Sequence, residues 1–329
     1  MLKYYNAEVR GIPVDENGEK IDFSMLFADV LSIIKGVTYP ETNKYKKDIN
    51  EELNKIKVVL DFSPVPNAYA NSKSLGVNLG MISLFLSIPD LSEHILNILK
   101  HGNKISIDEY SRYKIPENIL SELNEILLCW KVIHESNWTK FSFPKSFLEE
   151  KNTPIYLNLL RILVGHELGH WEENIYREDE WESLMKDMED NIYSWIEHIE
   201  AINSDYAKEV RDFLESDSDI IENWKREVFS DVRGCFFCKN ALGWGFNQER
   251  QLELHLSISL YFFVLRLLEI FCDQNELELD YHTHPTGTMR ESIFMYIYAK
   301  EMNIPFDSLI YSEFGFIGYI LNCISSDLI

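Results

Sequence analysis

Apolar positions recur at helical spacing through much of the second half of this chain. From Trp181 to Tyr206 they follow one another at alternating intervals of four and three residues, with charged residues between them. This heptad pattern predicts a long amphipathic helix, broken near residues 203–205. Its apolar seam packs either on the rest of the domain or on another chain, and the pattern leaves both alternatives open.

The same periodicity predicts further helices. Pro154 suits the first turn of a helix that continues through Tyr156–Glu173 and is apolar almost all round, which indicates a central, buried position. An apolar stripe through Trp224, Val228, Val232 and Phe236 predicts another helix. The remaining predicted helices cover residues 24–36, 42–57, 81–88, 92–100, 115–136 and 252–272.

Extended structure is predicted mainly in the first quarter of the chain. Lys57–Phe62 has the β-branched pair typical of a short strand, and residues 64–79 indicate a hairpin that turns at Asn71–Ser74. Residues 1–23 favour strand or loop. Because no repeat, low-complexity tract or linker divides the chain, we expect a single α+β domain over residues 1–329, mainly α-helical, with a helical insertion at 174–222.

More than half of the net negative charge of the chain lies in and around that insertion. The chain carries a net charge of −23, and residues 172–222 hold 18 acidic and 4 basic residues, a net of −14. Since phosphate binding needs concentrated Lys and Arg, we expect neither nucleic acid nor an anionic membrane as partner. A chain with 46% hydrophobic residues also has ample material for a core, which excludes wholesale disorder.

The cysteines and the apolar segments of the sequence indicate in which cellular compartment the protein is expected. Five scattered cysteines suit a reducing cytoplasm better than a disulfide framework, and the N-terminal residues show no secretory apolar region. The most apolar stretch, Leu256–Cys272, is 17 residues long and contains Arg266 and Glu269, so a buried core helix is favoured over a membrane span. The single Cys235–Cys238 pair is interpreted as core. We therefore expect a cytoplasmic protein.

The candidate chemistry begins with His166-Glu167-Leu168-Gly169-His170, an HExxH motif inside the predicted buried helix. Residues i and i+4 face the same way on a helix, about 6 Å apart along its axis, so both imidazoles can reach one metal ion. Zinc suits such a site, with three protein ligands and one position open for water. Glu167 would lie beside the ion and take a proton from the activated water.

A third ligand is expected downstream. Glu227 lies on the helix with the apolar stripe and can supply a carboxylate oxygen, and Asp231 follows one turn later. Asp231 is placed to accept a hydrogen bond from the far ring nitrogen of a ligand histidine, which fixes its tautomer and orientation. Taken alone, such a pair of carboxylates is usually a solvated helix face, but with HExxH upstream we interpret it as part of one zinc site per chain.

The segment Tyr281–Arg290 completes the candidate site. A hydrolase that adds water to a carbonyl needs a hydrogen-bond donor for the oxyanion, and His284 on its proline-stiffened turn is our candidate. His282 competes for the same role. Arg290 is expected to hold a carboxylate of the site in place.

Together the motifs HELGH, EVFSD and THPTGTMR resemble the gluzincin metallopeptidases of the CAAX prenyl protease and HtpX class, and also the soluble phage-exclusion peptidase Lit family. The resemblance spans about Val65–Ile293. It implies a zincin-like core with His166, His170 and Glu227 as zinc ligands and Glu167 as base. Asp231, His284 and Arg290 would support them, and Leu75, Gly76, Val77 and Asn78 would bind the substrate backbone as an edge strand.

This chain departs from that class in three respects. It has no multiple membrane spans, Ser230 replaces the usual alanine, and the acidic insertion has no counterpart that can be transferred. We therefore expect an endopeptidase that acts on a protein or peptide. In one form of this hypothesis, the enzyme is inactive until a trigger binds. The alternative is a partner-binding regulator with a structural or vestigial zinc site, acting through the Trp181–Tyr206 seam. The insertion itself is interpreted as an acidic lid or docking arm beside the site.

Overall fold

The structure is a computed structural model, and it describes the chain in several stretches. The described residues are 7–10, 24–37, 45, 48–61, 68–78, 80–82, 154–242, 248–274 and 280–307, with isolated residues at 85, 91, 95, 121, 124, 315, 317, 318, 320 and 321. Most of the predicted helices 81–88, 92–100 and 115–136 therefore lie outside the described residues.

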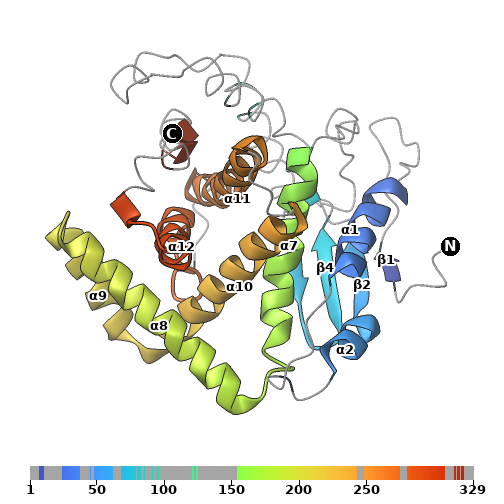
Figure 1. The fold of residues 1–329 in the computed structure, drawn as a ribbon, viewed down its shortest axis with the longest axis horizontal. Helices are drawn as coiled ribbons and strands as arrows, with labels where there is room; N and C mark the ends of the chain where they lie inside the picture. The colour runs from blue at the N-terminus through green and yellow to red at the C-terminus, as the bar shows by residue number, and fades with distance from the viewer. Residues whose placement is uncertain are drawn as a thin grey trace.

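The described part of the chain is mainly helical, with one small sheet, which confirms the α+β, mainly α-helical class (Figure 1). Its helices are α1 (Ser24–Gly36), α2 (Ile49–Lys55), α7 (Pro154–Glu172), α8 (Glu178–Glu200), α9 (Ser204–Ser216), α10 (Ser218–Leu242), α11 (Gln248–Gln274) and α12 (Gly287–Glu301). Pro154 opens α7, as its place in the pattern predicts.

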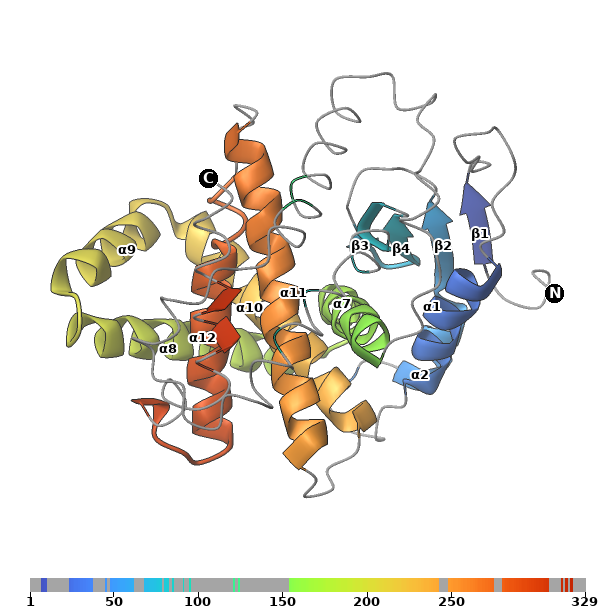
Figure 2. The ribbon, with the colours of Figure 1, turned by 90° about the horizontal axis from the view of Figure 1, so that it is seen from above.

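Four strands form the sheet in the order β1-β2-β4-β3. Their bounds are β1 (Ala7–Arg10), β2 (Lys57–Asp61), β3 (Ala68–Ala70) and β4 (Ser74–Asn78). β1 and β4 pair with β2 in parallel, whereas β3 pairs with β4 antiparallel, which confirms the predicted hairpin. The Asn71 side chain closes its turn by accepting hydrogen bonds from the backbone N–H groups of Lys73 and Ser74. Helices α1, α2 and α7 lie on one side of this sheet (Figure 2).

The helix expected over 42–57 is shorter than predicted. Asp48 caps α2, because its carboxylate accepts hydrogen bonds from the N–H groups of Asn50 and Glu51. Before the cap, Tyr45 forms an isolated β-bridge with Tyr176, and after the helix Lys57 begins β2. An N-cap carboxylate at position 48 thus decides where the helix starts, although the apolar periodicity extends further on both sides.

Small residues bring α7 and α10 into close contact where the two helices cross (Figure 1). A Cβ atom added to Gly169 would lie 2.8 Å from the Cα atom of Ser230, and one added to Gly165 would lie 2.8 Å from the Cα atom of Gly234. A Cβ atom on Gly234 would overlap the carbonyl oxygen of Ile162. The crossing matters for the site, since Gly169 precedes His170 and Ser230 precedes Asp231.

Replacing Gly169 by alanine is expected to push α10 away from α7, because the obstructing atom is backbone that cannot rotate away. Alanine favours a helix over glycine by about 1 kcal/mol, and overpacking costs about 1–3 kcal/mol. Relative to a matched Gly36→Ala control, whose Cβ meets nothing within 4 Å, the free energy of unfolding should fall by about 1–3 kcal/mol. Urea denaturation of the two variants measures the difference, and equal stabilities would contradict this account of the crossing.

The acidic insertion is a hairpin of α8 and α9, broken at residues 201–203, slightly before the break predicted near residues 203–205. Its seam residues Met185, Met188, Ile192 and Trp195 are buried in an apolar cluster with residues of α10 and α12. The Trp195 indole also donates a hydrogen bond to Ser292 Oγ of α12 at 2.9 Å. The same chain therefore covers most of the seam, which does not favour the alternative in which these side chains bind a second chain, whereas Ile202 at the break is 70% exposed.

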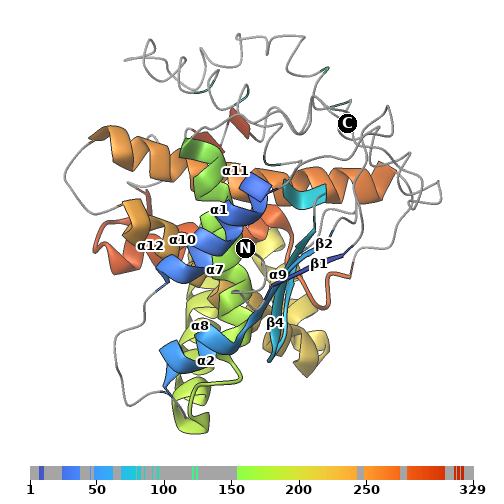
Figure 3. The same ribbon diagram turned by 90° about the vertical axis from the view of Figure 1, so that its right-hand side faces the viewer.

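Helix α11 crosses α7 on the side of the molecule away from α8 (Figure 3). Its segment Arg250–Cys272 is the one helix among the described residues that is long and apolar enough to cross a membrane, and 78% of its apolar 18-residue stretch is buried inside the protein. Cys235 and Cys238 of α10 are buried and free, which confirms their interpretation as core residues. Trp171 is likewise buried in the core.

Candidate metal centre

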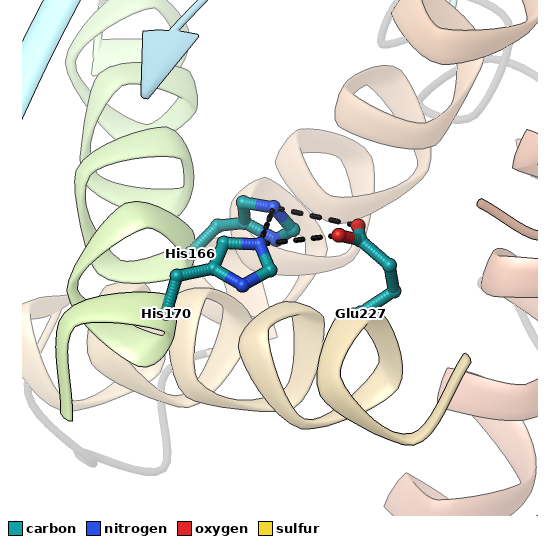
Figure 4. Close-up of side chains that lie close together, drawn as sticks. All are labelled: His166, His170 and Glu227. Atoms are coloured by element: carbon teal, nitrogen blue, oxygen red, sulfur yellow. Dashed lines mark hydrogen bonds and ion pairs between the residues drawn. The ribbon is translucent and has the colours of Figure 1, made fainter. Parts of the chain in front are cut away.

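The HExxH histidines and Glu227 meet where α7 crosses α10 (Figure 4). The Nε2 atoms of His166 and His170 lie 3.1 Å apart. Glu227 approaches both, with Oε1 3.2 Å from His170 Nε2 and Oε2 3.7 Å from His166 Nε2. These three residues each offer one ligand atom, and the atoms all lie within 4.8 Å of one another, so the group could hold a metal ion.

Asp231 and Arg290 contact this group of residues through hydrogen bonds and an ion pair. Asp231 Oδ1 lies 3.0 Å from His166 Nδ1, so a proton on Nδ1 leaves Nε2 free to bind a metal. Arg290 donates two hydrogen bonds to Asp231, from Nε at 2.8 Å and from Nη2 at 2.7 Å. Its Nη2 also lies 3.3 Å from Glu227 Oε2. The predicted contacts of Asp231 and Arg290 are thus present in the structure.

The charges of the site suit a cation. Burial by itself would raise the pKa of Glu227, but Arg290 and the hydrogen bond from His170 hold that pKa well below its usual range. Burial acts on Asp231 in the same direction, and Arg290 outweighs it there too, so the pKa of Asp231 is lowered. Burial raises the pKa of Glu167, an effect that His166 and His170 partly offset. The site therefore combines two ionised carboxylates with a third whose proton affinity is increased.

The turn before α12 settles which histidine faces the site. His284 Nε2 lies 3.4 Å from Glu227 Oε1, and its other ring nitrogen, Nδ1, lies 2.6 Å from Thr283 Oγ1. The His282 ring instead packs against Phe213 of α9, with ring centroids 5.6 Å apart. Of the two candidates for the oxyanion donor, His284 is therefore the one beside the candidate ligands.

A polar pocket of about 410 Å³ opens beside the candidate ligands. It is bounded by the end of β3 and its turn, the last turn of α7, the first half of α10 and the segment with His284. The lining residues are Ala70, Asn71, Ser72, His170, Glu173, Asn174, Asn223, Arg226, Glu227, Thr283 and His284. A ligand in this pocket would therefore contact the His170–Glu227–His284 side of the site.

The prediction that residues 75–78 form an edge strand is wrong. Leu75, Gly76, Val77 and Asn78 belong to β4, which lies between β2 and β3 and pairs with both, so its backbone has no free edge. All four residues are also buried. Among the described strands, β3 forms the edge on this side of the sheet, and Ala70 at its end lines the pocket.

Several residues of the site carry no signal in the linear sequence. Asn174, Asn223 and Arg226 line the pocket, and an ion pair of 3.0 Å joins Arg226 to Glu173. Tyr261 of α11 is buried with its ring centroid 6.4 Å from that of His166. Burial raises the pKa of its hydroxyl. Only the proximity of Thr283 to His284 in the chain offers a local cue, since the other residues approach through helix packing.

The donor set fits a zinc ion. Two imidazole nitrogens and a carboxylate oxygen are the ligands typical of a catalytic zinc. Glu227 Oε2 is buried and accepts no hydrogen bond among the described residues, although Arg290 Nη2 lies 3.3 Å away, so this oxygen has an acceptor position left for a metal ion. Comparisons with protein-family models, with curated proteins and with solved structures found no match to this chain.

Proposed function

We propose that this chain is a zinc-dependent endopeptidase of the gluzincin type, with α7, α10 and the sheet as a zincin-like core. The observation that carries the proposal is that His166, His170 and Glu227 each bring one possible ligand atom to within 4.8 Å of the others. Each histidine sits on the buried helix at the spacing that metal binding requires. Zinc, when bound, lowers the pKa of water to about 7 and polarises a carbonyl group.

The proton transfer, the stabilisation of negative charge and the orientation of His166 are assigned to other residues of the chain. Glu167 accepts a proton from the attacking water and delivers it to the leaving amine, a role that suits a carboxylate whose pKa burial has raised. His284 Nε2 donates a hydrogen bond to the oxygen on which negative charge develops. Asp231, held by Arg290, keeps the His166 ring in one orientation. The pocket supplies the space for a substrate side chain next to the scissile bond.

The substrate backbone adds to β3 in this proposal. β3 is the outer strand at the pocket side of the described sheet, and Ala70, Asn71 and Ser72 border the pocket beside His170. An extended peptide that pairs with such an edge gains main-chain hydrogen bonds whatever its sequence.

Replacing Glu227 by alanine is expected to abolish stoichiometric zinc binding, because two histidines alone leave the ion without its charged ligand. Elemental analysis of the purified variant measures the metal content. Asp219→Ala, which removes an exposed carboxylate from the same helix, is the matched control and should keep one zinc per chain. If Glu227→Ala retains zinc, this carboxylate is not a ligand.

Mapping of new protein N-termini tests the activity itself. Cells that express the wild-type chain should contain cleaved N-termini that are missing from cells expressing Glu167→Gln at the same level. Purified wild-type protein should carry one zinc ion. Identical sets of N-termini, together with bound zinc, would favour the regulator with a structural metal site. Absence of metal would reject both.

A further inference from the structure

The segment of residues 280–286, the His284 loop, is held against α10 by two side chains of that helix. The Trp224 indole donates a hydrogen bond to the carbonyl oxygen of Tyr281 at 3.0 Å. Asn223 Nδ2 donates one to the carbonyl oxygen of His282 at 3.3 Å. The Trp224 side chain that donates the first of these bonds is itself buried. The loop that presents His284 is therefore attached to the helix that presents Glu227.

Helix α9 reaches the same loop from the acidic hairpin. The Phe213 ring contacts two of the groups just described: it packs against the His282 ring, at 5.6 Å between centroids and 64° between planes, and against Trp224 at 6.0 Å. Phe213 thus bridges the loop and its anchor. Aromatic pairs at such separations stabilise beyond the area that they bury.

The hairpin itself is firmly attached to the rest of the protein. Ala207, Val210 and Leu214 of α9 are buried in the apolar cluster that includes residues of α8, α10 and α12. On α8, Asn191 accepts a hydrogen bond from Lys300 Nζ of α12 at 2.7 Å. The buried Lys225 of α10 lies 3.4 Å from Glu189 of α8. A surface supported in this way can hold another element in place.

We propose that the α8–α9 hairpin braces the His284 loop, with Phe213 as a positioning residue that acts through His282 and Trp224. The brace keeps His284 Nε2 next to Glu227, where the proposed function needs a hydrogen-bond donor. This inference rests on the proposed function for its purpose, but the contact can be tested without catalysis or bound metal. It gives the acidic insertion a role inside the protein that differs from a lid or a docking arm.

The test compares Phe213→Ala with wild type in the full-length protein. Hydrogen exchange measured by mass spectrometry should be about two- to tenfold faster for residues 281–284, as expected from the loss of one aromatic pair, and unchanged within α7. In the same variant, ¹⁵N spectra of labelled histidine rings should show shifted His282 and His284 signals. His282→Gln and His284→Gln assign those signals.

Three further variants separate positioning from stability. Phe213→Tyr keeps the ring and should restore both the exchange rates and the histidine signals. Phe213→Leu keeps an apolar side chain without a ring and should resemble Phe213→Ala, which guards against an alanine variant that fails to fold. Val210→Ala truncates a buried side chain of the same helix and should leave the loop as in wild type.

The opposite results overturn the inference. Wild-type exchange and wild-type histidine signals in both Phe213→Ala and Phe213→Leu would show that α9 does not hold the loop. An equal effect of Val210→Ala would show that Phe213 only stabilises the hairpin. Neither result depends on peptidase activity, so failure of the brace and failure of the proposed function can be told apart.

Discussion

Replacing Arg290 by alanine is expected to lower the free energy of unfolding by about 3–5 kcal/mol, the cost of breaking a buried ion pair by removing one partner. Arg290 is only 6% exposed, makes two hydrogen bonds to Asp231 and lies 3.3 Å from Glu227. Without it, two buried carboxylates face each other without a compensating side-chain cation. Urea denaturation of the metal-free protein at pH 7 measures the loss without a contribution from bound zinc.

The pH dependence of this loss follows from the pKa of Asp231. In the wild type that pKa is lowered in the folded state, so Asp231 contributes stability above its unfolded pKa and loses it as pH falls. In Arg290→Ala, burial is opposed only by His166, so the folded pKa of Asp231 is higher than in the wild type and the variant loses less stability as pH falls. The gap between the two proteins should therefore narrow from pH 7 towards pH 4.

Two controls identify the cause. Arg211→Ala removes a surface partner of Glu200 and should leave stability close to wild type. Adding Asp231→Asn to Arg290→Ala should restore part of the lost stability, since one of the two stranded charges is removed. A gap between Arg290→Ala and wild type that stays constant with pH would argue that lost packing, and not stranded charge, destabilises the variant.

Replacing Glu167 by glutamine should reduce kcat by about 10²–10⁴-fold, the usual contribution of a general base. The substrate is one identified by N-terminal mapping. Zinc content and stability should stay at the wild-type level, because glutamine has the same shape and burial already disfavours the charged carboxylate. Steady-state kinetics, elemental analysis and thermal unfolding on one preparation provide the three readouts.

Glu172→Gln is the matched control for Glu167→Gln. It lies on the same helix, is buried and accepts a hydrogen bond from Arg233 at 2.6 Å, away from the candidate ligands. Its replacement should lower stability and leave kcat nearly unchanged, the reverse of the result expected for Glu167. A Glu167→Gln enzyme that keeps full kcat would remove the peptidase mechanism proposed for this chain.

Local patterns predicted much of the structure near the site. The limits of α1 and α7, the break between α8 and α9 and the hairpin at Asn71 all follow from neighbours in the chain. Such features depend on residues one to four positions apart, whose effects repeat wherever the pattern occurs. The start of α2 was missed because one carboxylate, Asp48, caps the helix inside a longer apolar periodicity.

Those local patterns do not determine which strands pair with one another. Leu75–Asn78 has the composition of a strand in any position of a sheet, and only the register of β2 on one side and β3 on the other makes it interior. The choice between His282 and His284 had the same origin. Their chemistry is identical, and the contact between His282 and Phe213, about 70 residues earlier in the chain, decides which ring faces Glu227.

By itself, then, the sequence determined the candidate ligand pair His166 and His170, because a helix places residues i and i+4 on one face. Tertiary structure alone decided that Glu227 reaches them, since this depends on the close crossing of Gly169 and Ser230. It also decided that Met185, Met188, Ile192 and Trp195 of the seam are buried against α10 and α12 of the same chain. Helical periodicity is a property of adjacent turns, whereas approach between distant helices depends on which side chains are small enough to let their backbones meet.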